Sequence, residues 1–339
     1  MQIVSISKHQ YYYQRTGKKQ GVKASTHTLT AKGSKVTNSI ILSTIKTIMK
    51  NFDTQYGYIK MSFLLKTKGF IINKKKVYRI MKENNLLGKR YENKSKTYAK
   101  YRKVLPTEPL HVLEMDIKFV WVEQARKHAY VLTVIDTFTR LILYHTVELS
   151  IKKEDVKQAW EEIIKNHLQP NDCMKNKIEI EVRNDNDKRF SAELVRDFFK
   201  ENYLNQIFTH PYTPQENGHI ESFHAILSRH LKPYTFWSLE ELKQNLILFY
   251  EFYNNTRIHS SIVYTSPRSF WQLWNLNLIE TKVDYKKRKT DFKLKIPHYE
   301  IQQHTGNNEL EGSPLLDFEK IVYSDKKMIS AETSKQLTV

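Results

Sequence analysis

A single cysteine, Cys173, occurs in the 339 residues of this chain, which excludes a disulfide framework and is typical of proteins that stay in a reducing cytoplasm. No apolar run approaches the roughly 18 residues that a membrane-spanning helix requires, and the opening residues lack the features of a signal peptide. We therefore expect a soluble protein. Hydrophobic residues make up 40% of the chain, with 20 Tyr, 16 Phe and 5 Trp, so we expect two or three folded domains rather than a disordered chain.

Acidic residues are almost missing from the first third of the chain. Residues 1–105 contain 24 Lys and Arg but only Asp53, Glu83 and Glu92 as acids, whereas the remainder contains 31 basic and 33 acidic residues. An AT-rich genome would enrich lysine everywhere, and it does not explain the shortage of acids in one third. A basic module beside a near-neutral one indicates a nucleic-acid-binding domain attached to a catalytic domain.

Residues 1–88 are predicted to form a basic helical region, with an all-α helix-turn-helix domain over about 39–86. Asn38 is expected to cap a helix that ends near residue 52, because Asn is a favoured N-cap and apolar residues follow at helical spacing. A second helix over about 59–68 should end at Gly69, since glycine suits the position just past a helix.

A third helix is predicted to start after Asn73 and to run to about residue 85. Its outward face carries three basic side chains at helical spacing: Lys75, Arg79 and Lys82. A capped basic helix that follows a Gly-containing turn is typical of the recognition helix that enters the major groove of DNA. The alternative is an ordinary solvated face with no DNA contact.

Residues 89–106 are predicted to be a basic linker without helical periodicity. Four of its cations are candidate DNA contacts: Lys89, Arg90, Arg102 and Lys103. Three tyrosines lie among the cations, so the segment is suited to follow a phosphate backbone and to stack on bases. A flexible solvated tether is the alternative.

Residues 107–275 show alternating strand and helix patterns. Strands are predicted over about 110–122, 128–136, 141–148, 177–184 and 206–209, and helices over about 153–167, 191–202, 221–232 and 239–255. Three strands joined by hairpins and followed by alternating helices and strands predict an α/β fold, a mixed five-stranded sheet with helices on its faces. Residues 276–339 are predicted to be a tail, in which a basic run before alternating apolar residues suggests a small β appendage; a frayed tail is the alternative.

Three carboxylates stand at informative places in this layout. Asp116 interrupts an otherwise apolar strand, where a charge is costly unless a cation or partner compensates it. Asp185 follows an alternating strand, and Glu221 begins a helix whose apolar residues recur at spacings of three and four. Both aspartates are placed to reach a helix packed across the sheet.

Oxygen-only ligands of this kind suit Mg²⁺ or Mn²⁺. We predict that Asp116, Asp185 and Glu221 are catalytic and bind two such cations, since paired ions about 4 Å apart promote phosphodiester chemistry. Asp136 is an alternative first ligand at the end of the next strand. Its other interpretation is a turn-capping residue paired with Arg140.

Several motifs around these acids resemble one family. They are the segments 131–140, 184–186, 210–221, 252–259 and 264–267. In order and spacing they resemble the integrase core of bacterial insertion-sequence transposases, over about residues 40 to 275. The sequence is most similar in these motifs to OrfB-type transposases, relatives of retroviral integrases, and the segment 56–86 resembles the helix-turn-helix of that family.

The resemblance implies a ribonuclease-H-like fold and a catalytic triad of Asp116, Asp185 and Glu221. It implies a transposase that cleaves the 3′ ends of an insertion sequence and joins them to target DNA in the bacterial cytoplasm, on the nucleoid. The implied partners are terminal inverted repeats, target DNA, further copies of the chain on DNA, and an upstream OrfA protein as partner or fusion. With one cysteine, the chain cannot itself carry the His₂Cys₂ zinc module of retroviral integrases.

The sequence departs from the family pattern at two positions. Asp187 stands where the family usually has a glycine that serves a tight turn, and Ser228 stands where a Lys or Arg usually holds the DNA end. His224 and Arg229, which lie close to Ser228 on the predicted Glu221 helix, are candidate DNA contacts in place of that Lys or Arg. The departures leave open a decayed copy or a DNA-binding regulator without catalysis. A nuclease of the same fold that cleaves DNA without joining it is a further alternative.

Overall fold

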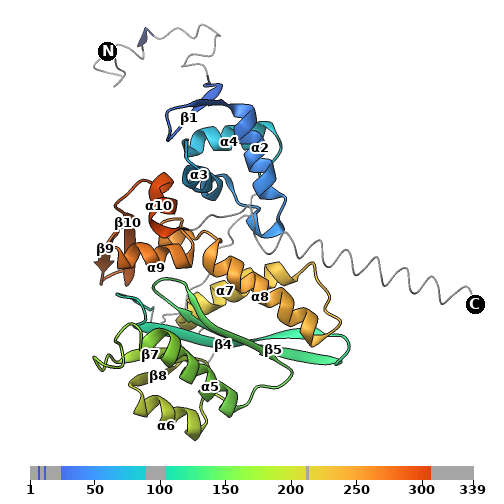
Figure 1. Ribbon diagram of the computed structural model, residues 1–339, viewed down its shortest axis with the longest axis vertical. Helices are drawn as coiled ribbons and strands as arrows, with labels where there is room; N and C mark the ends of the chain where they lie inside the picture. The colour runs from blue at the N-terminus through green and yellow to red at the C-terminus, as the bar shows by residue number, and fades with distance from the viewer. Residues whose placement is uncertain (1–6, 8–10, 13–23, 89–103, 211–213, 307–339) are drawn as a thin grey trace, which may run out of the picture.

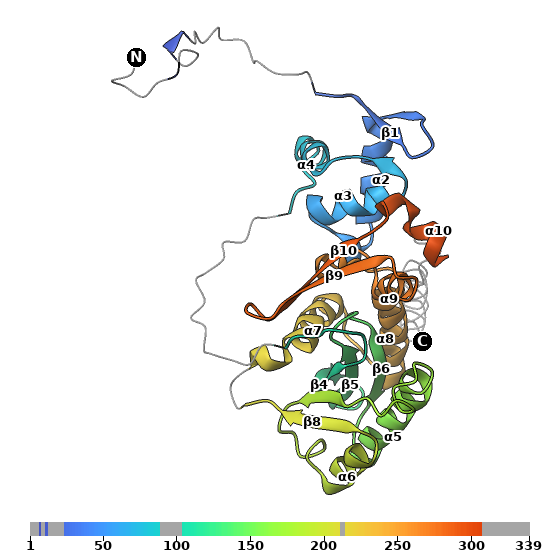
Figure 2. The same cartoon turned by 90° about the vertical axis from the view of Figure 1, so that its left-hand side faces the viewer.

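The computed structural model describes residues 7, 11–12, 24–88, 104–210 and 214–306. A helical N-terminal part lies above a sheet with helices on both faces, and a C-terminal β-hairpin lies between the two (Figures 1 and 2). Within the described ranges, no helix is long and apolar enough to cross a membrane.

The N-terminal domain is built on α2 (Asn38–Met49), α3 (Tyr58–Thr67) and α4 (Lys74–Glu83). Their apolar faces share one core, which includes Ile41, Ile45, Met61, Leu65 and Ile80. A short 3₁₀ helix, η2 (Phe52–Thr54), joins α2 to α3. The order helix, Gly-containing turn, basic helix is the one that the sequence predicts.

The domain is not purely α-helical, which corrects the prediction. Strands β1 (His27–Thr30), β2 (Lys35–Thr37) and β3 (Phe70–Ile71) form a small antiparallel sheet in the order β2-β1-β3. Strands this short contain too few residues for a two-residue periodicity to stand out in the sequence.

Two of the three predicted helix boundaries are confirmed. The Asn73 side chain accepts a hydrogen bond from the backbone N–H of Lys75 at 2.7 Å, and Gly69 follows α3 with φ of +85°. The predicted cap at Asn38 is wrong, because Thr37 precedes the helix and the Asn38 amide donates to the backbone oxygen of Ser25 at 3.0 Å. Pairing with the strand segment before α2 thus replaces a local cap.

The catalytic-core region contains a five-stranded sheet in the order β6-β5-β4-β7-β8. Strand β5 pairs antiparallel with both β4 and β6, whereas β4 pairs in parallel with β7, and β7 pairs in parallel with β8. This arrangement confirms the predicted ribonuclease-H-like mixed sheet. The strands are β4 (Val112–Val122), β5 (Lys127–Asp136), β6 (Ile142–Glu148), β7 (Ile180–Asn184) and β8 (Leu204–Phe208).

Each face of the sheet has its own core. Helices α5 (Lys153–Ile163), with the π-turn η3 (Ile164–Leu168), and α6 (Glu193–Glu201) pack on the face that holds Leu113 and Met115. Helices α7 (Gly218–Leu231) and α8 (Leu239–Asn255) pack on the other face. Because successive strand residues point to opposite faces, Glu114 and Asp116 lie on the α7 side of β4.

The segment after α8 closes the fold. It contains η5 (Ser260–Ile262), α9 (Pro267–Asn275), the hairpin β9 (Ile279–Asp284) and β10 (Lys289–Leu294), η6 (His298–Glu300) and α10 (Ile301–Thr305). Phe292 of the hairpin lies edge-on to Phe138 of the core, with ring centroids 4.9 Å apart. In α3, Phe63 stacks on Tyr264 at 3.8 Å, so the same segment also contacts the N-terminal domain.

Replacing Gly69 by Ser should lower the stability of the N-terminal domain by about 1–2 kcal/mol, because a side chain is strained at positive φ. The matched control is Gly57→Ser. Gly57 precedes α3 in extended conformation (φ −65°), where Ser is a favoured N-cap, so stability should hold or rise. Urea midpoints of the two variants check this, and equal midpoints would contradict the assignment of Gly69.

Candidate active site

Asp116 lies on β4, the central strand of the sheet, beneath helix α7. Parallel pairing of β4 with β7 sets Glu114 opposite Arg183. Extending this register by two residues aligns Asp116 with Asp185, which follows the last residue of β7. Neighbouring strands are about 4.8 Å apart, so this extension would set the two aspartates beside each other on the central strand and at the end of its neighbour.

Glu221 lies in the first turn of α7, the helix that packs over β4 and β5. Partial burial, followed by the negative charge of Asp116, raises the pKa of Glu221 to about 7, and Glu114 adds to the effect. The pKa of Asp185 is also raised, first by partial burial and then by Asp116 among its neighbouring charges. The charge of Asp116 therefore acts on both other acids.

The donor chemistry of these side chains fits a divalent cation. All three offer carboxylate oxygens. Partial burial and, after it, the negative charge of Asp116 raise the pKa values of Asp185 and Glu221, and a bound cation would favour the charged form of both. No group of three or more His, Cys, Asp or Glu side chains in the described residues is close enough to hold an ion as it stands. The strands and α7 thus carry the three acids on neighbouring elements, but their side-chain oxygens do not converge on one point.

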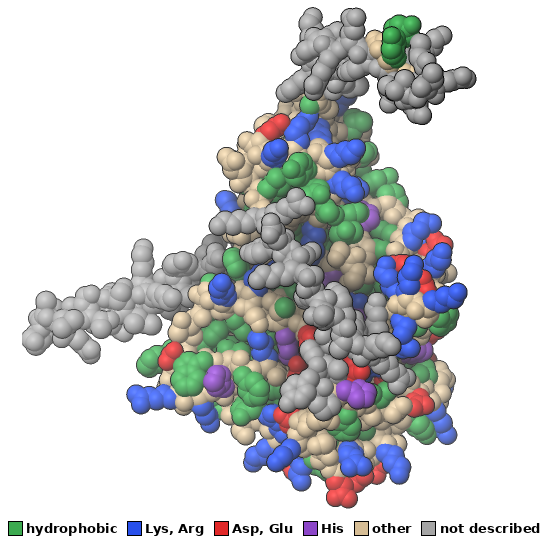
Figure 3. Space-filling view, turned by 180° about the vertical axis from the view of Figure 1, so that it is seen from behind, with side chains coloured by type: hydrophobic (Ala, Val, Ile, Leu, Met, Phe, Trp, Pro, Cys, Tyr) green, Lys and Arg blue, Asp and Glu red, His purple; other side chains and the backbone are tan. Residues whose placement is uncertain are grey.

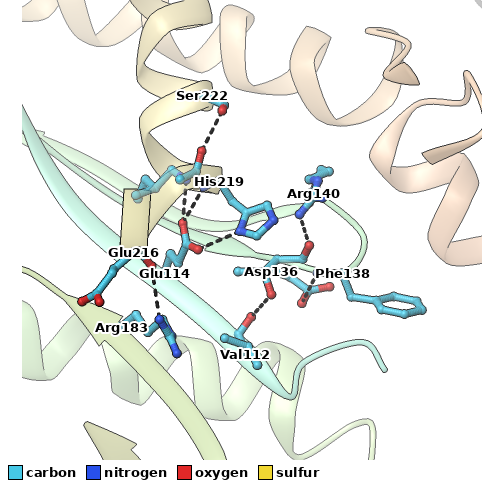
Figure 4. A network of polar contacts seen from close by, with 12 residues as sticks. Val112, Glu114, Asp136, Phe138, Arg140, Arg183, Glu216, His219 and Ser222 are labelled. Carbon is cyan, nitrogen blue, oxygen red and sulfur yellow. Dashed lines mark hydrogen bonds and ion pairs between the residues drawn. The ribbon is translucent and has the colours of Figure 1, made fainter. Parts of the chain in front are cut away.

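Glu114 is a functional residue that the sequence analysis missed (Figure 4). Its side chain is fully buried, and its carboxylate accepts hydrogen bonds from the backbone N–H groups of His219 at 2.9 Å and Ile220 at 2.8 Å. The ring Nδ1 of His219 contacts the other oxygen at 2.7 Å. Asn217, at the N-cap position of α7, makes no capping bond with its side chain. Glu114 therefore caps α7 from the neighbouring strand and holds the turn that carries Glu221.

His224, a predicted DNA contact, lies beside Asp116. Its Nδ1 lies 3.3 Å from an Oδ atom of Asp116, and its side chain is largely buried. Its Nε2 is buried without a hydrogen-bond partner in the described part of the chain. The side chain one turn after Glu221 thus contacts the candidate site directly, and its partner is an acid.

Asp136 is a turn-capping residue, as the alternative interpretation holds (Figure 4). It is fully buried and accepts hydrogen bonds from the backbone N–H groups of Leu110, Phe138 and Thr139. Burial raises its pKa. Arg140 pairs with the turn through its backbone: its N–H donates to the backbone oxygen of Asp136 at 2.9 Å, and its side chain donates to the backbone oxygen of Thr137. A carboxylate enclosed by these donors faces no metal site.

The two departures from the family pattern have structural accounts. The Asp187 carboxylate accepts hydrogen bonds from the backbone N–H of Arg189 at 2.9 Å and from the Nε of Arg189 at 2.8 Å, and these bonds hold the pKa of Asp187 below its usual value. Its charge is paired with Arg189, but it still contributes, after burial and Asp116, to the raised pKa of Asp185. Asp187 is also not among the residues with positive φ, so the turn requires no glycine. Ser228 is exposed, and its hydroxyl donates to the backbone oxygen of His224 at 2.7 Å.

The predicted DNA contacts of the N-terminal domain fall into two groups. Lys75 and Lys82 are exposed on α4, whereas Arg79 is half-buried and donates to the backbone oxygen of Ser25 at 2.8 Å. The linker candidates Lys89, Arg90, Arg102 and Lys103 lie outside the described residues. Figure 3 shows Lys and Arg side chains spread over the N-terminal domain and gathered, together with acids, near the β9–β10 hairpin.

Comparison with protein families matches this architecture in order. Residues 37–94 match an HTH-like domain, and residues 106–214 and 202–267 match two models of the integrase core domain. The matched core carries Asp116, Asp185 and Glu221. The chain is therefore similar, in this order, to an HTH-like domain and to the integrase core domain.

Its curated relatives come from insertion elements. The chain is 25% identical over 218 residues to the uncharacterized 39.2 kDa protein of insertion element IS476 from Xanthomonas euvesicatoria, an alignment that covers 64% of this chain but only 60% of that protein. It is 22% identical over 249 residues to the transposase for insertion sequence element IS904 from Lactococcus lactis, covering 69% of this chain and 94% of that protein. The resemblance to insertion-sequence transposases is thus confirmed.

Solved structures overlap with the chain only in part. The catalytic core domain of BIV integrase matches with a TM-score of 0.37 and 18% identity, covering 50% of this chain and 97% of that one. The catalytic domain of Mos1 mariner transposase matches with a TM-score of 0.34 and 16% identity, covering 42% and 70%. The similarity to integrase cores and to insertion-element proteins therefore rests on the domain matches and on the sequence relatives.

Glu221 should make the stability of the metal-free protein depend on pH. Its folded pKa of about 7 exceeds the ordinary value of 4.5, so between these values the folded state binds more protons than the unfolded state. Stability must then fall as pH rises through this window, and Mn²⁺, which competes with the proton, should stabilise more at pH 8 than at pH 5.5. Glu221→Gln should weaken both trends in thermal melts. The exposed Glu240→Gln is the control, and identical melts of both variants would contradict the assignment.

Replacing Glu114 by Gln should loosen the first turn of α7. The buried carboxylate loses charge-assisted hydrogen bonds to the helix N-terminus, at a cost of about 1–3 kcal/mol. Hydrogen exchange of the His219 and Ile220 amides should therefore accelerate while DNA affinity stays near wild type. Glu123→Gln, at an exposed position just after β4, should change neither quantity. Unchanged amide protection in the Glu114 variant would exclude the capping role.

Proposed function

We propose that this protein is an insertion-sequence transposase, in which Asp116, Asp185 and Glu221 form the catalytic triad. The observation that carries the proposal is the β4–β7 register, which aligns the two aspartates, together with the packing of α7 over the same strand. The raised pKa values of Asp185 and Glu221 support it, because partial burial and, after it, the negative charge of Asp116 raise both of them. Insertion-element relatives support the same chemistry.

The three carboxylates would hold Mg²⁺ or Mn²⁺, two ions per site, and bound cations would lower the pKa of the attacking group and offset the charge that develops on phosphorus. Other parts of the chain orient these three carboxylates. The strands orient Asp116 and Asp185, and the Glu114 cap orients the turn of Glu221. His224, beside Asp116, limits the directions open to that carboxylate.

Two reactions follow one another in this proposal. In the first, a water oxygen bonds to the phosphorus at an element end as the bond to the 3′ oxygen breaks, and that oxygen takes up a proton to become a free 3′-OH. In the second, this hydroxyl loses its proton and attacks a phosphodiester of target DNA, whose own 3′ oxygen leaves. Both steps are in-line displacements without a covalent enzyme intermediate. The number of phosphodiester bonds is unchanged in the second step.

The DNA partners would be the terminal inverted repeats, read by α4 through Lys75 and Lys82, and the target duplex. Two element ends must meet for joining, so the working complex would contain more than one copy of the chain. An upstream OrfA protein is a further partner that the family resemblance implies. The reaction would take place in the bacterial cytoplasm on the nucleoid.

Incubation of labelled element ends with target DNA and Mg²⁺ or Mn²⁺ tests the triad. Asp116→Asn, Asp185→Asn and Glu221→Gln should each reduce cleavage and joining by at least about 10³-fold while DNA binding persists, because each removes a charged ligand. Asp197→Asn, exposed on α6 across the sheet, is the matched control and should keep wild-type activity. Cleavage and joining that survive the triad substitutions would refute the assignment, and cleavage without joining by the wild type would indicate a nuclease.

A further inference from the structure

A cavity of about 370 Å³ lies between the N-terminal domain and the catalytic core. Its wall combines the η2–α3 connection, α3, the later part of α7 and the residue that follows the end of α8 by two positions. Three cationic side chains line it: Lys60 of α3, Arg229 of α7 and Arg257. Each comes from a different part of the chain, so the three cations are brought together only in the folded protein. No run of basic residues in the sequence predicts this cluster.

Arg257 is the most deeply buried of the three, with 6% of its surface exposed. Its Nη1 donates to the backbone oxygen of Asp53 at 3.2 Å, and its guanidinium carbon lies 5.9 Å from the centre of the Tyr56 ring. Its Nε is buried and has no hydrogen-bond acceptor among the described residues. A buried N–H of a charged group is unfavourable without an acceptor, and an anion in the cavity would supply one.

Lys60 is fixed beside Arg257. Its Nζ donates to the backbone oxygen of Ile258 at 3.0 Å and lies 5.2 Å from the centre of the Tyr56 ring. Burial, then the positive charges of Arg257 and Arg229, lower the pKa of Lys60 to about 8. The three cations therefore repel one another across the cavity.

The acid at this interface does not compensate them. Asp53 lines the cavity, but its carboxylate contacts Nδ1 of His230 at 2.7 Å. The other ring nitrogen of His230 contacts Asn245 of α8 at 2.9 Å, which completes a buried chain between the two domains. In the described part of the chain, no ion pair within 4.0 Å links Lys60, Arg229 or Arg257 to a carboxylate. The cavity keeps an excess of positive charge.

We propose that this cavity binds one backbone phosphate of DNA, with Lys60, Arg229 and Arg257 as its donors. The inference rests on the proposed function and deepens it, because it names a contact that the DNA makes with both domains at once. A phosphodiester matches the chemistry, since it carries one negative charge and several acceptor oxygens, and Arg and Lys are its usual partners. Inorganic phosphate shares this chemistry, but the position beside a DNA-reading domain favours DNA.

The site would couple DNA binding to the catalytic helix. Arg229 lies about two turns after Glu221 on α7, so a phosphate held by Lys60 and Arg229 would connect the N-terminal domain to the helix that carries the third acid. The helix-turn-helix and the active site would then be placed at a set distance along the bound DNA.

The test measures binding of a labelled duplex that ends in the terminal repeat to Lys60→Gln, Arg229→Gln and the double variant, at several salt concentrations. Gln keeps hydrogen-bonding capacity and removes the charge. We expect each single variant to bind DNA about five- to tenfold more weakly. The negative slope of log K against log salt should decrease in magnitude by about 0.9 when the phosphate contact is lost. Arg196→Gln, exposed on α6, is the matched control and should bind as wild type does.

Wild-type affinity and salt slope in both charge-removal variants would overturn the phosphate site, whatever the triad substitutions do. The same holds if inorganic phosphate raises the melting temperature of the wild type but not of the variants, while DNA binding is equal in all of them, because the cavity would then be a free-anion site. Joining that persists in Asp116→Asn would instead refute the proposed function and leave the binding result unaffected. The two failures are therefore distinguishable.

Discussion

The buried carboxylate of Glu114 is the interaction on which the candidate site depends. It lies on the central strand two residues before Asp116, and it binds the first N–H groups of the helix that carries Glu221. One strand therefore presents one acid of the site and positions another. Because a buried carboxylate is costly without donors, the strand and the helix terminus stabilise each other, and the spacing of the acids follows from that contact.

The acids of the candidate site show which features could be predicted from the sequence and which depend on tertiary packing. Asp116 stands out in the sequence because a charge inside an apolar strand needs compensation, and the strand lengths in the core agree with the periodicity. Glu114 was overlooked because its partner, His219, is 105 residues later, and only the packing of α7 on β4 reveals it. The alignment of Asp116 with Asp185 depends on the register of β4 and β7, which single-strand patterns do not determine. The sequence indicates the position of His224 on its helix, but only the packing of α7 on β4 reveals its contact with Asp116.

Charge in this protein is organised at two levels. The excess of Lys and Arg in residues 1–105 is evident in the sequence and indicates a DNA-binding module. The cluster of Lys60, Arg229 and Arg257 forms only when the N-terminal domain packs on α7 and on the segment after α8. Glu221 of the candidate site and Arg229 of the cavity share helix α7, so in the proposed account this helix would connect DNA binding to catalysis.

The most direct measurement of the central claim is the anomalous scattering of Mn²⁺ in crystals of the protein. The account predicts manganese within coordination distance of Asp116, Asp185 and Glu221, with the Glu114 contact to α7 intact. Manganese bound elsewhere, with these three carboxylates left apart, would contradict it.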